Sequence, residues 1–140
     1  AAELVGLADE AFDRTVAFLK ERRQFDRVIG EFQGLQHRAS ILYCDIELAR
    51  AATLKALQLL DSEVAADGKA TTVAVAVAVA KARAGRSATL AVQEGVQMHG
   101  GMGMTDEFEM GFFMKRARVL QELYGDSNFH ADRLARQRGY

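Results

Sequence analysis

The sequence predicts an all-α fold, an antiparallel four-helix-bundle-like domain formed by residues 1–140. Three observations lead to this prediction. Proline, the usual helix breaker, is absent from the chain. Alanine and leucine, which favour helices most strongly, dominate the composition. Apolar residues recur at helical spacing in long segments that are separated only by short breaks, the pattern of a bundle with short connections.

The first two helices are predicted by amphipathic patterns. The first spans Glu3 to Arg22, and its apolar positions are Leu4, Leu7, Ala8, Ala11, Val16, Phe18 and Leu19. The segment from Phe25 to Gly30 breaks this pattern and predicts a short turn. The second helix runs from about Glu31 to Asp61, with an apolar face made of Leu35, Leu42, Ile46, Ala49, Leu54, Ala56 and Leu60.

The third helix is predicted across a segment where two rules disagree. Asp67-Gly68 predicts a turn, after which valine and alanine alternate from Val73 to Ala80. Strict alternation is typical of a strand, but both residue types are apolar, so the pattern equally fits a helix that is buried on all sides. Nothing else in the sequence offers a strand partner. We therefore predict one long helix from about Lys69 to Met98 in the middle of the bundle.

Two shorter helices complete the predicted bundle. Gly100, Gly101 and Gly103 predict a loop after the long helix. The next helix is expected from about Asp106 to Gln121. The last begins near Ser127, a plausible N-cap residue, and ends near Arg138.

Composition excludes several functional classes. The 18 Lys and Arg residues balance 19 Asp and Glu residues, which argues against a nucleic-acid or acidic-membrane partner. The longest apolar run, Ala70 to Ala80, is shorter than the roughly 20 residues that a membrane span needs. The single cysteine, Cys44, excludes an internal disulfide, and the three histidines lack ligand spacing, so no metal is expected. We expect a cytoplasmic domain and, because the chain begins at Ala1, a fragment of a longer protein.

Two clusters of residues suggest ligand binding. Arg22 to Arg27, followed by Phe32-Gln33, places a guanidinium, an aromatic ring and amides at the junction of two helices, where they can bind a phosphate. Gln97 to Thr105 places glycines, whose backbone N–H groups are open to a ligand, just after an amide side chain.

The order of these motifs resembles the C-terminal domain of acyl-CoA dehydrogenases. It consists of Arg-x-Gln-Phe, Ile-Gly-x-Phe-Gln, a long Ala-rich helix and Gln-x-x-Gly-Gly-x-Gly. The stretch from Met98 to Ala117 looks closest to bacterial members that include pimeloyl-CoA dehydrogenase small subunits. The resemblance implies a domain that packs subunits into dimers or tetramers around FAD. It also implies a parent enzyme that dehydrogenates acyl-CoA thioesters and passes electrons to electron-transfer flavoprotein.

The resemblance also implies which residues contact the cofactor. Arg22 and Gln24 match family residues near the FAD pyrophosphate and adenine of a neighbouring subunit, with Phe25 beside them. The other matching positions are Gln33, also a cofactor contact, and Gln97, Gly100 and Gly101, which line the adenosine end. Ser127 occupies the position of a family threonine, where it either contacts the flavin or caps the last helix.

One position departs from the family pattern. Members commonly carry a catalytic Glu in a Tyr-Glu-Gly-Thr stretch, whereas this chain has Tyr124-Gly125-Asp126-Ser127, so Gly125 stands where the base is expected. Three alternatives follow: Asp126 is a displaced base, the base lies upstream or in a partner subunit, or the chain is a cofactor-clamping and assembly subunit with a paired large subunit. The last two together rank above Asp126. The isolated fragment is expected to lack dehydrogenase activity, and a helical adaptor without cofactor is the remaining class.

Overall fold

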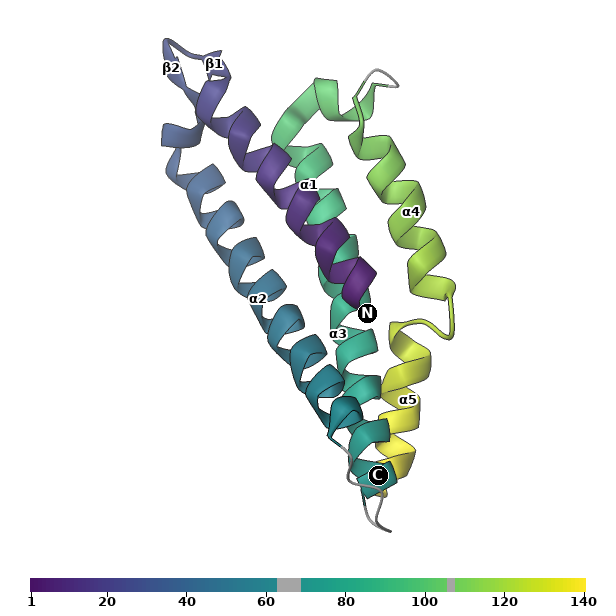
Figure 1. The fold of residues 1–140 in the computed structure, drawn as a ribbon. Helices are drawn as coiled ribbons and strands as arrows, with labels where there is room; N and C mark the ends of the chain where they lie inside the picture. The colour runs from purple at the N-terminus through teal and green to yellow at the C-terminus, as the bar shows by residue number, and fades with distance from the viewer. Residues whose placement is uncertain (63–68, 106–107) are drawn as a thin grey trace.

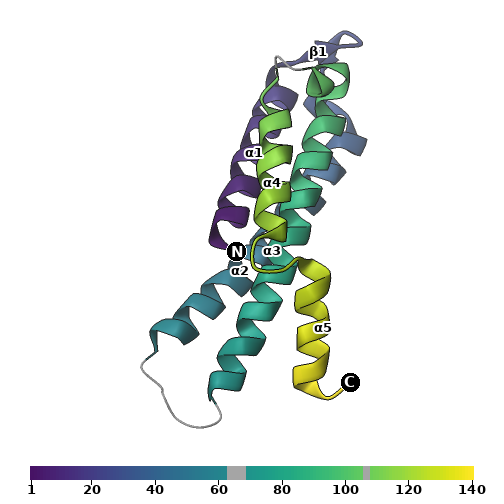
Figure 2. The same ribbon diagram turned by 90° about the vertical axis from the view of Figure 1, so that its right-hand side faces the viewer.

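The computed structural model of the chain describes residues 1–62, 69–105 and 108–140, and it confirms the predicted all-α bundle (Figure 1). Its α-helices are α1 (Ala2–Glu21), α2 (Gln33–Asp61), α3 (Lys69–His99), α4 (Met110–Glu122) and α5 (Ser127–Arg138). The first three run antiparallel to their neighbours in the chain. α4 and α5 follow one another along α3, and together they form the fourth member of the bundle (Figure 2).

The long helix α3 is the centre of the bundle, because it packs against α1, α2, α4 and α5. The valine-alanine run lies within α3, which confirms the predicted helix. Its backbone groups are satisfied inside the helix itself, so no strand partner is needed. Further along α3, Ala84, Ala88 and Ala91 are fully buried, and their small side chains let the neighbouring helices approach closely.

The core lies between α1, α2, α3 and α4, and it contains most of the predicted apolar positions. Leu4 of α1 and Leu42 and Ile46 of α2 are each only 1% exposed. The predicted face of α2 is wrong at two positions, since Leu54 and Leu60 are 51% and 56% exposed. The lower part of α2 extends beyond the start of α1, so in this chain that part of the helix is covered mainly on its α3 side (Figure 2).

The segment between α1 and α2 is more ordered than the predicted turn. It forms a β-hairpin of two antiparallel strands, β1 (Arg23–Gln24) and β2 (Arg27–Val28), followed by a 3-10 turn, η1 (Ile29–Glu31). Phe25 and Asp26 form the tip with φ angles of 55° and 62°. The expectation that nothing in the chain forms β structure is therefore wrong here. These strands are too short to show the alternation by which a strand is predicted from sequence.

The glycine segment after α3 forms a 3-10 turn, η2 (Gly100–Met104), rather than an irregular loop. α4 begins at Met110, later than the predicted start at Asp106, and Asp106 lies outside the described residues, as does the predicted Asp67-Gly68 turn. In the part of the chain that the structure describes, no helix combines the length and apolar character needed to cross a bilayer.

The last helix begins where predicted, but its cap is a different residue. Asp126 is the N-cap of α5, and its Oδ1 accepts a hydrogen bond from the backbone N–H of Phe129 at 2.7 Å. The prediction of Ser127 as N-cap is therefore wrong. Ser127 is buried, and its hydroxyl instead donates to the backbone oxygen of Ala82 in α3 at 3.0 Å, which ties the start of α5 to the centre of the bundle.

Candidate functional site

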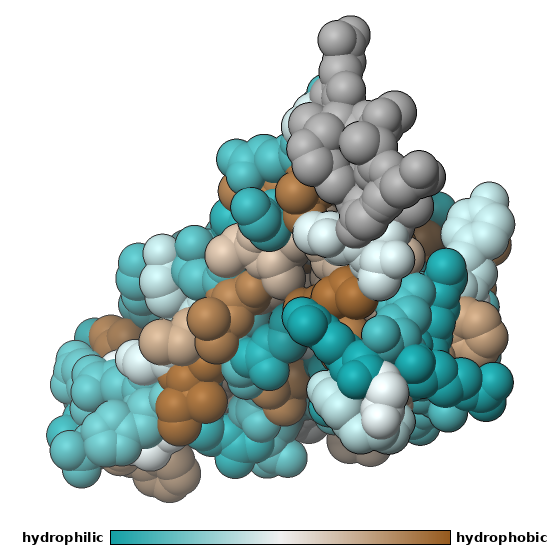
Figure 3. Space-filling model, turned by 90° about the horizontal axis from the view of Figure 1, so that it is seen from below, coloured by the Kyte–Doolittle hydropathy of each residue, from teal (hydrophilic) through white to brown (hydrophobic). Residues whose placement is uncertain are grey.

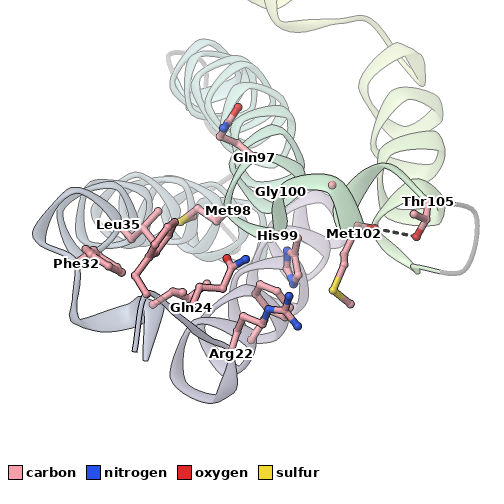
Figure 4. A pocket seen from close by; sticks show the side chains of 14 residues that line it. Arg22, Gln24, Phe32, Leu35, Gln97, Met98, His99, Gly100, Met102 and Thr105 are labelled. Carbon is pink, nitrogen blue, oxygen red and sulfur yellow. Dashed lines mark hydrogen bonds between the residues drawn. The ribbon is translucent and has the colours of Figure 1, made fainter. Parts of the chain in front are cut away.

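The hairpin end of the bundle contains a cavity of about 580 Å³ (Figure 4). It lies where the hairpin and the start of α2 meet the end of α3 and the turn η2. The sequence-predicted residues that line it are Arg22, Gln24, Phe25, Gln97, Gly100 and Gly101. The fold thus brings two motifs, far apart in the sequence, to one cavity.

Arg22 is placed by the end of α1. Its backbone is extended, with φ −68° and ψ 127°, and its carbonyl accepts a hydrogen bond from the N–H of Ile29 at 2.8 Å. This bond closes the base of the hairpin. The side chain is exposed, and in the described ranges no hydrogen bond or ion pair engages its guanidinium. Arg22 therefore offers an unpaired bidentate donor at the rim of the cavity, the arrangement that suits a phosphate.

The hairpin also presents an aromatic ring to the outside. Phe25, at the tip, is 82% exposed. Its ring lies edge-on to that of Phe32, with 6.0 Å between the ring centres, and the guanidinium of Arg27 lies 4.1 Å from the Phe32 ring centre. Exposure of these aromatic rings to water is unfavourable. The ring pair is therefore suited to contact with a flat ligand or a second protein surface.

The glycines of η2 differ in whether backbone conformation or packing requires a glycine. Gly100 has a φ of +61°, a conformation that side chains rarely adopt, and a Cβ on Gly103 would lie 2.6 Å from the backbone oxygen of Val96. Gly101 has neither constraint, because its φ lies outside the positive region and a Cβ there would have no neighbour within 4 Å. The open backbone of Gly101 faces the cavity, where a ligand can approach it closely.

His99 connects the core to this cavity. Its ring lies between Phe18 and Phe108, with 4.3 Å to each ring centre, and Nδ1 donates to the backbone oxygen of Gly95 at 2.7 Å. In the neutral ring Nε2 carries no hydrogen, and it is buried without a partner among the described residues. Burial lowers the pKa of His99 despite the opposing bond to Gly95. In the sequence, this histidine lies within the Gln97–Thr105 cluster, although its spacing gave no reason to assign it as a metal ligand.

Figure 4 shows how the labelled side chains are distributed. Arg22 and Gln24 lie close to His99, on the hairpin side, whereas Gln97 lies further along, beyond Met98. Among the lining residues outside the two clusters singled out in the sequence are Phe18, Ile29 and Leu35, whereas Met98, Met102 and Thr105 lie within the Gln97–Thr105 cluster. The methionines also bracket the glycine turn in the sequence.

The remaining predicted residues do not line this cavity. Gln33 is exposed at the start of α2. Gly125, Asp126 and Ser127 lie at the junction of α4 and α5, away from the hairpin end (Figure 1). Gly125 has a φ of +95°, and a Cβ there would meet the Phe129 ring at 2.3 Å, so a Glu at this position would be strained and would have to displace that ring.

Comparison with known proteins identifies the family. The family description "Acyl-CoA dehydrogenase, C-terminal domain" matches residues 1–138. The chain belongs to the acyl-CoA dehydrogenase family. It is 36% identical over 125 residues to acyl-CoA dehydrogenase IpdE2 of Mycolicibacterium smegmatis, which covers 89% of this chain and 36% of that protein. It is 33% identical over 137 residues to a probable short/branched chain specific acyl-CoA dehydrogenase of Dictyostelium discoideum, covering 98% of this chain and 32% of that protein.

Solved structures that match this acyl-CoA dehydrogenase domain share its helical-bundle fold. Butyryl-CoA dehydrogenase from Megasphaera elsdenii superposes with a TM-score of 0.85 at 25% identity, over 96% of this chain and 33% of that one. A chain of the ChsE4-ChsE5 complex from Mycobacterium tuberculosis gives 0.87 at 21% identity, over 97% and 35%, and shows the fold alone. The chain thus spans about a third of the length of the relatives it matches. The relatives named here are not pimeloyl-CoA dehydrogenases, so they support the family and not that narrower resemblance.

Proposed function

We propose that this chain is the FAD-binding and oligomerisation domain of an FAD-dependent acyl-CoA dehydrogenase. The observation that carries the proposal is the meeting of the Arg22–Phe25 and Gln97–Gly101 motifs at one cavity. Both motifs match family positions for the cofactor. When bound, FAD would supply the hydride acceptor for the dehydrogenation of an acyl-CoA between its α and β carbons, with a base elsewhere in the parent enzyme for the α-proton.

The residues present fit the nucleotide half of FAD. The unpaired guanidinium of Arg22 suits the pyrophosphate, and the amides of Gln24 and Gln97 can pair with a nucleobase or ribose. Gly101 is a glycine that neither its conformation nor its packing requires, as expected where a cofactor approaches the backbone. Phe25, which is exposed at the hairpin tip, and Gln33, at the start of α2, are proposed as further cofactor contacts, Phe25 with the cofactor of a neighbouring subunit.

The test is the FAD content of the parent enzyme after two substitutions. Arg22→Ala and Gln97→Ala are each expected to weaken FAD binding about tenfold or more, because a charge-assisted or buried hydrogen bond is lost. Arg86→Ala and Gln93→Ala, at exposed positions of α3, are the matched controls. Unchanged FAD content in both site variants would refute the proposal and favour a helical adaptor.

A second candidate rests on Gly125. Neither a side chain at this position nor Asp126, whose carboxylate caps α5, supplies a free base in this arrangement. The alternative is a cofactor-clamping and assembly subunit of a hetero-oligomeric dehydrogenase, with the base upstream or in a large subunit. Purification of the parent with and without a co-expressed second subunit separates the two functions. Turnover that appears only with the second subunit supports the alternative.

The remaining assignments follow from the same proposal. The substrate is an acyl-CoA, the assembly a dimer or tetramer, the electron acceptor electron-transfer flavoprotein and the location the cytoplasm. The isolated 140 residues are expected to show no turnover with an artificial electron acceptor, since they represent about a third of the relatives' length. Turnover by the isolated chain would contradict this assignment.

A further inference from the structure

One buried nitrogen at the hairpin-end cavity has no partner within the described bundle. His99 is only 4% exposed, and its ring lies between Phe18 and Phe108. Nδ1 donates to the backbone oxygen of Gly95 at 2.7 Å, whereas Nε2 is buried without a hydrogen-bond partner among the described residues. Burial of an unpaired polar atom is unfavourable, and most such atoms in folded proteins are paired. Nε2 therefore points to a group that the bundle itself does not supply.

The hydrogen bond at Nδ1 determines what kind of group can pair with Nε2. A carbonyl oxygen only accepts, so Nδ1 carries the ring proton and Nε2 of the neutral ring is an acceptor. The two ring nitrogens point in different directions, so Nε2 is turned away from the Gly95 carbonyl. The ring lines the cavity of about 580 Å³, and Figure 4 shows it projecting from the end of α3 toward Arg22. A hydroxyl or an amine of a ligand satisfies such an acceptor, whereas a phosphate oxygen does not.

The surroundings of the ring favour its neutral form. Of the residues that line the cavity, only Arg22, from the end of α1, and His99 itself have titratable side chains. The other lining residues, from the hairpin, the start of α2 and the turn η2, are uncharged. Burial lowers the pKa of His99, while the bond to Gly95 opposes that shift. Nε2 is therefore an acceptor at neutral pH.

A second buried histidine provides a comparison at the opposite end of the bundle. His130 is also 4% exposed, its Nε2 donates to the backbone oxygen of Tyr124 at 3.0 Å, and its Nδ1 is unpaired in the described ranges. The cavity beside it is mostly apolar, and the Lys81 ammonium there already donates to the backbone oxygens of Gln121 and Gly125. Seen from below, this end shows apolar surface between hydrophilic patches (Figure 3). The hairpin end, in contrast, combines the unpaired nitrogen with polar side chains that converge on one cavity, as is typical of a ligand site.

We propose that His99 is a ligand-binding residue of the hairpin-end cavity, where Nε2 accepts a hydrogen bond from a hydroxyl or an amine of the bound nucleotide. The inference rests on the proposed function, which supplies the nucleotide, and it adds a residue whose contribution depends on pH. Arg22 suits the anionic part of the same ligand, so the two side chains recognise different chemical groups. A protonated His99 carries a hydrogen on Nε2 and cannot accept, so this bond needs the neutral ring.

The test is the FAD affinity of the flavin-free parent enzyme with and without Nε2. His99→Phe keeps a ring between its two aromatic neighbours but removes the acceptor. It is expected to weaken FAD binding about tenfold, since a buried donor of the ligand is left unpaired. His99→Gln, which retains an acceptor oxygen on a side chain of similar reach, should recover part of the affinity. His130→Phe and His37→Phe, at a buried and an exposed histidine outside the cavity, are the matched controls and should leave the affinity unchanged.

The pH dependence of binding separates an acceptor from a cation. The affinity advantage of the unsubstituted enzyme over His99→Phe should be constant above about pH 6.5 and disappear as the pH falls below the lowered pKa of His99. An advantage that grows toward acid would mean that the imidazolium binds a phosphate, and it would overturn the acceptor role.

Nucleotide probes identify the donor group. ADP carries an exocyclic amine and the ribose hydroxyls, IDP lacks the amine, and 2′-deoxyADP lacks one hydroxyl. The penalty of His99→Phe should disappear with the probe that lacks the donor, and a penalty that persists with both assigns the bond to the remaining ribose hydroxyl.

Two results overturn the inference, and a third concerns the proposed function instead. If Arg22→Ala weakens FAD binding and His99→Phe does not, His99 has no part in binding and the proposed function still stands. If His99→Gln is as weak as His99→Phe, the ring acts through packing and not through an acceptor. If none of the cavity variants changes the FAD affinity, the proposed function itself is refuted.

Discussion

At the residue scale, the two adjacent glycines of η2 can be told apart by experiment. Gly101 has open space around its missing side chain, whereas Gly100 has a φ of +61°. Gly101→Ala is therefore expected to leave folding stability within about 0.5 kcal/mol of the parent but to weaken FAD binding. Gly100→Ala is expected to cost about 1 kcal/mol of stability, because alanine is strained in the left-handed region.

Thermal unfolding and FAD titration of both variants check this distinction. Equal FAD affinity in Gly101→Ala would mean that the cofactor does not approach this backbone. A stability loss in Gly101→Ala as large as that in Gly100→Ala would contradict the assignment of open space at position 101.

The buried histidines predict a pH dependence of stability. Burial lowers the pKa of both His99 and His130 below the ordinary value of 6.5. Each ring donates from one nitrogen to a carbonyl, and the other nitrogen is buried without a partner in the described ranges, so protonation would create an unsatisfied N–H. The unfolded chain binds these protons more readily than the folded one. The contribution of the two neutral histidines to the free energy of unfolding is therefore fully present above about pH 6.5 and is lost as the pH falls below the lowered pKa values.

Urea unfolding from about pH 7.5 to about pH 5 measures this loss. His99→Phe keeps an aromatic ring between Phe18 and Phe108 and removes one titrating group, so its stability should depend less steeply on pH. An unchanged slope in this variant would show that His99 does not contribute to the acid sensitivity.

At the element scale, the hairpin contains strain that one substitution can relieve. Asp26 has a φ of 62° at the second position of the tip, where glycine is favoured in two-residue hairpins. Asp26→Gly is expected to raise the free energy of unfolding by about 0.5–1 kcal/mol, and Asp26→Val to lower it by at least as much. Thermal denaturation of the two variants provides the measurement, and destabilisation by Asp26→Gly would contradict the strained tip.

The elements also show how far sequence reasoning reaches. The long helices were predictable because their apolar periodicity is continuous and proline is absent, and this settled even the valine-alanine run. The hairpin was not predictable, because its strands have two residues each and are held by backbone hydrogen bonds such as the one from Ile29 to Arg22, which most residue types can make. Arg22 and Gln97 could be assigned to one site only through a motif resemblance, since periodicity says nothing about which helix ends meet.

Lys81 illustrates a different limit. In the sequence it ends an apolar run and has no charged neighbour that suggests a partner. Its role depends on carbonyls of Gln121 and Gly125, and any residue type could supply those groups. The N-cap assignment failed for a related reason, because Asp126 and Ser127 are both good capping residues and only their orientation relative to Ala82 distinguishes them.

At the scale of the whole molecule, the distribution of apolar surface predicts self-association. Many large apolar side chains are exposed on α2 and α4, among them Ile41 at 64%, Leu48 at 58% and Phe112 at 67%. Single exposed apolar residues are ordinary in monomers, but a series of them along two helices is typical of a surface that another chain covers. We therefore expect the parent enzyme to sediment as a dimer or tetramer at all but the lowest concentrations.

Sedimentation of the parent enzyme and of two charge variants tests this expectation. Leu48→Glu on α2 and Phe112→Glu on α4 each place a charge on one of the two faces. Burying an unpaired charge is costly, so the substitution that lies in the subunit interface should shift the equilibrium toward smaller species. Lys55→Glu, at an exposed position of α2, is the control for added negative charge. A parent enzyme that remains monomeric throughout, or an assembly that neither substitution weakens, would contradict the role of these faces. Because FAD is proposed to be shared between subunits, loss of assembly should also release the cofactor, and this release distinguishes a cofactor-linked interface from an incidental one.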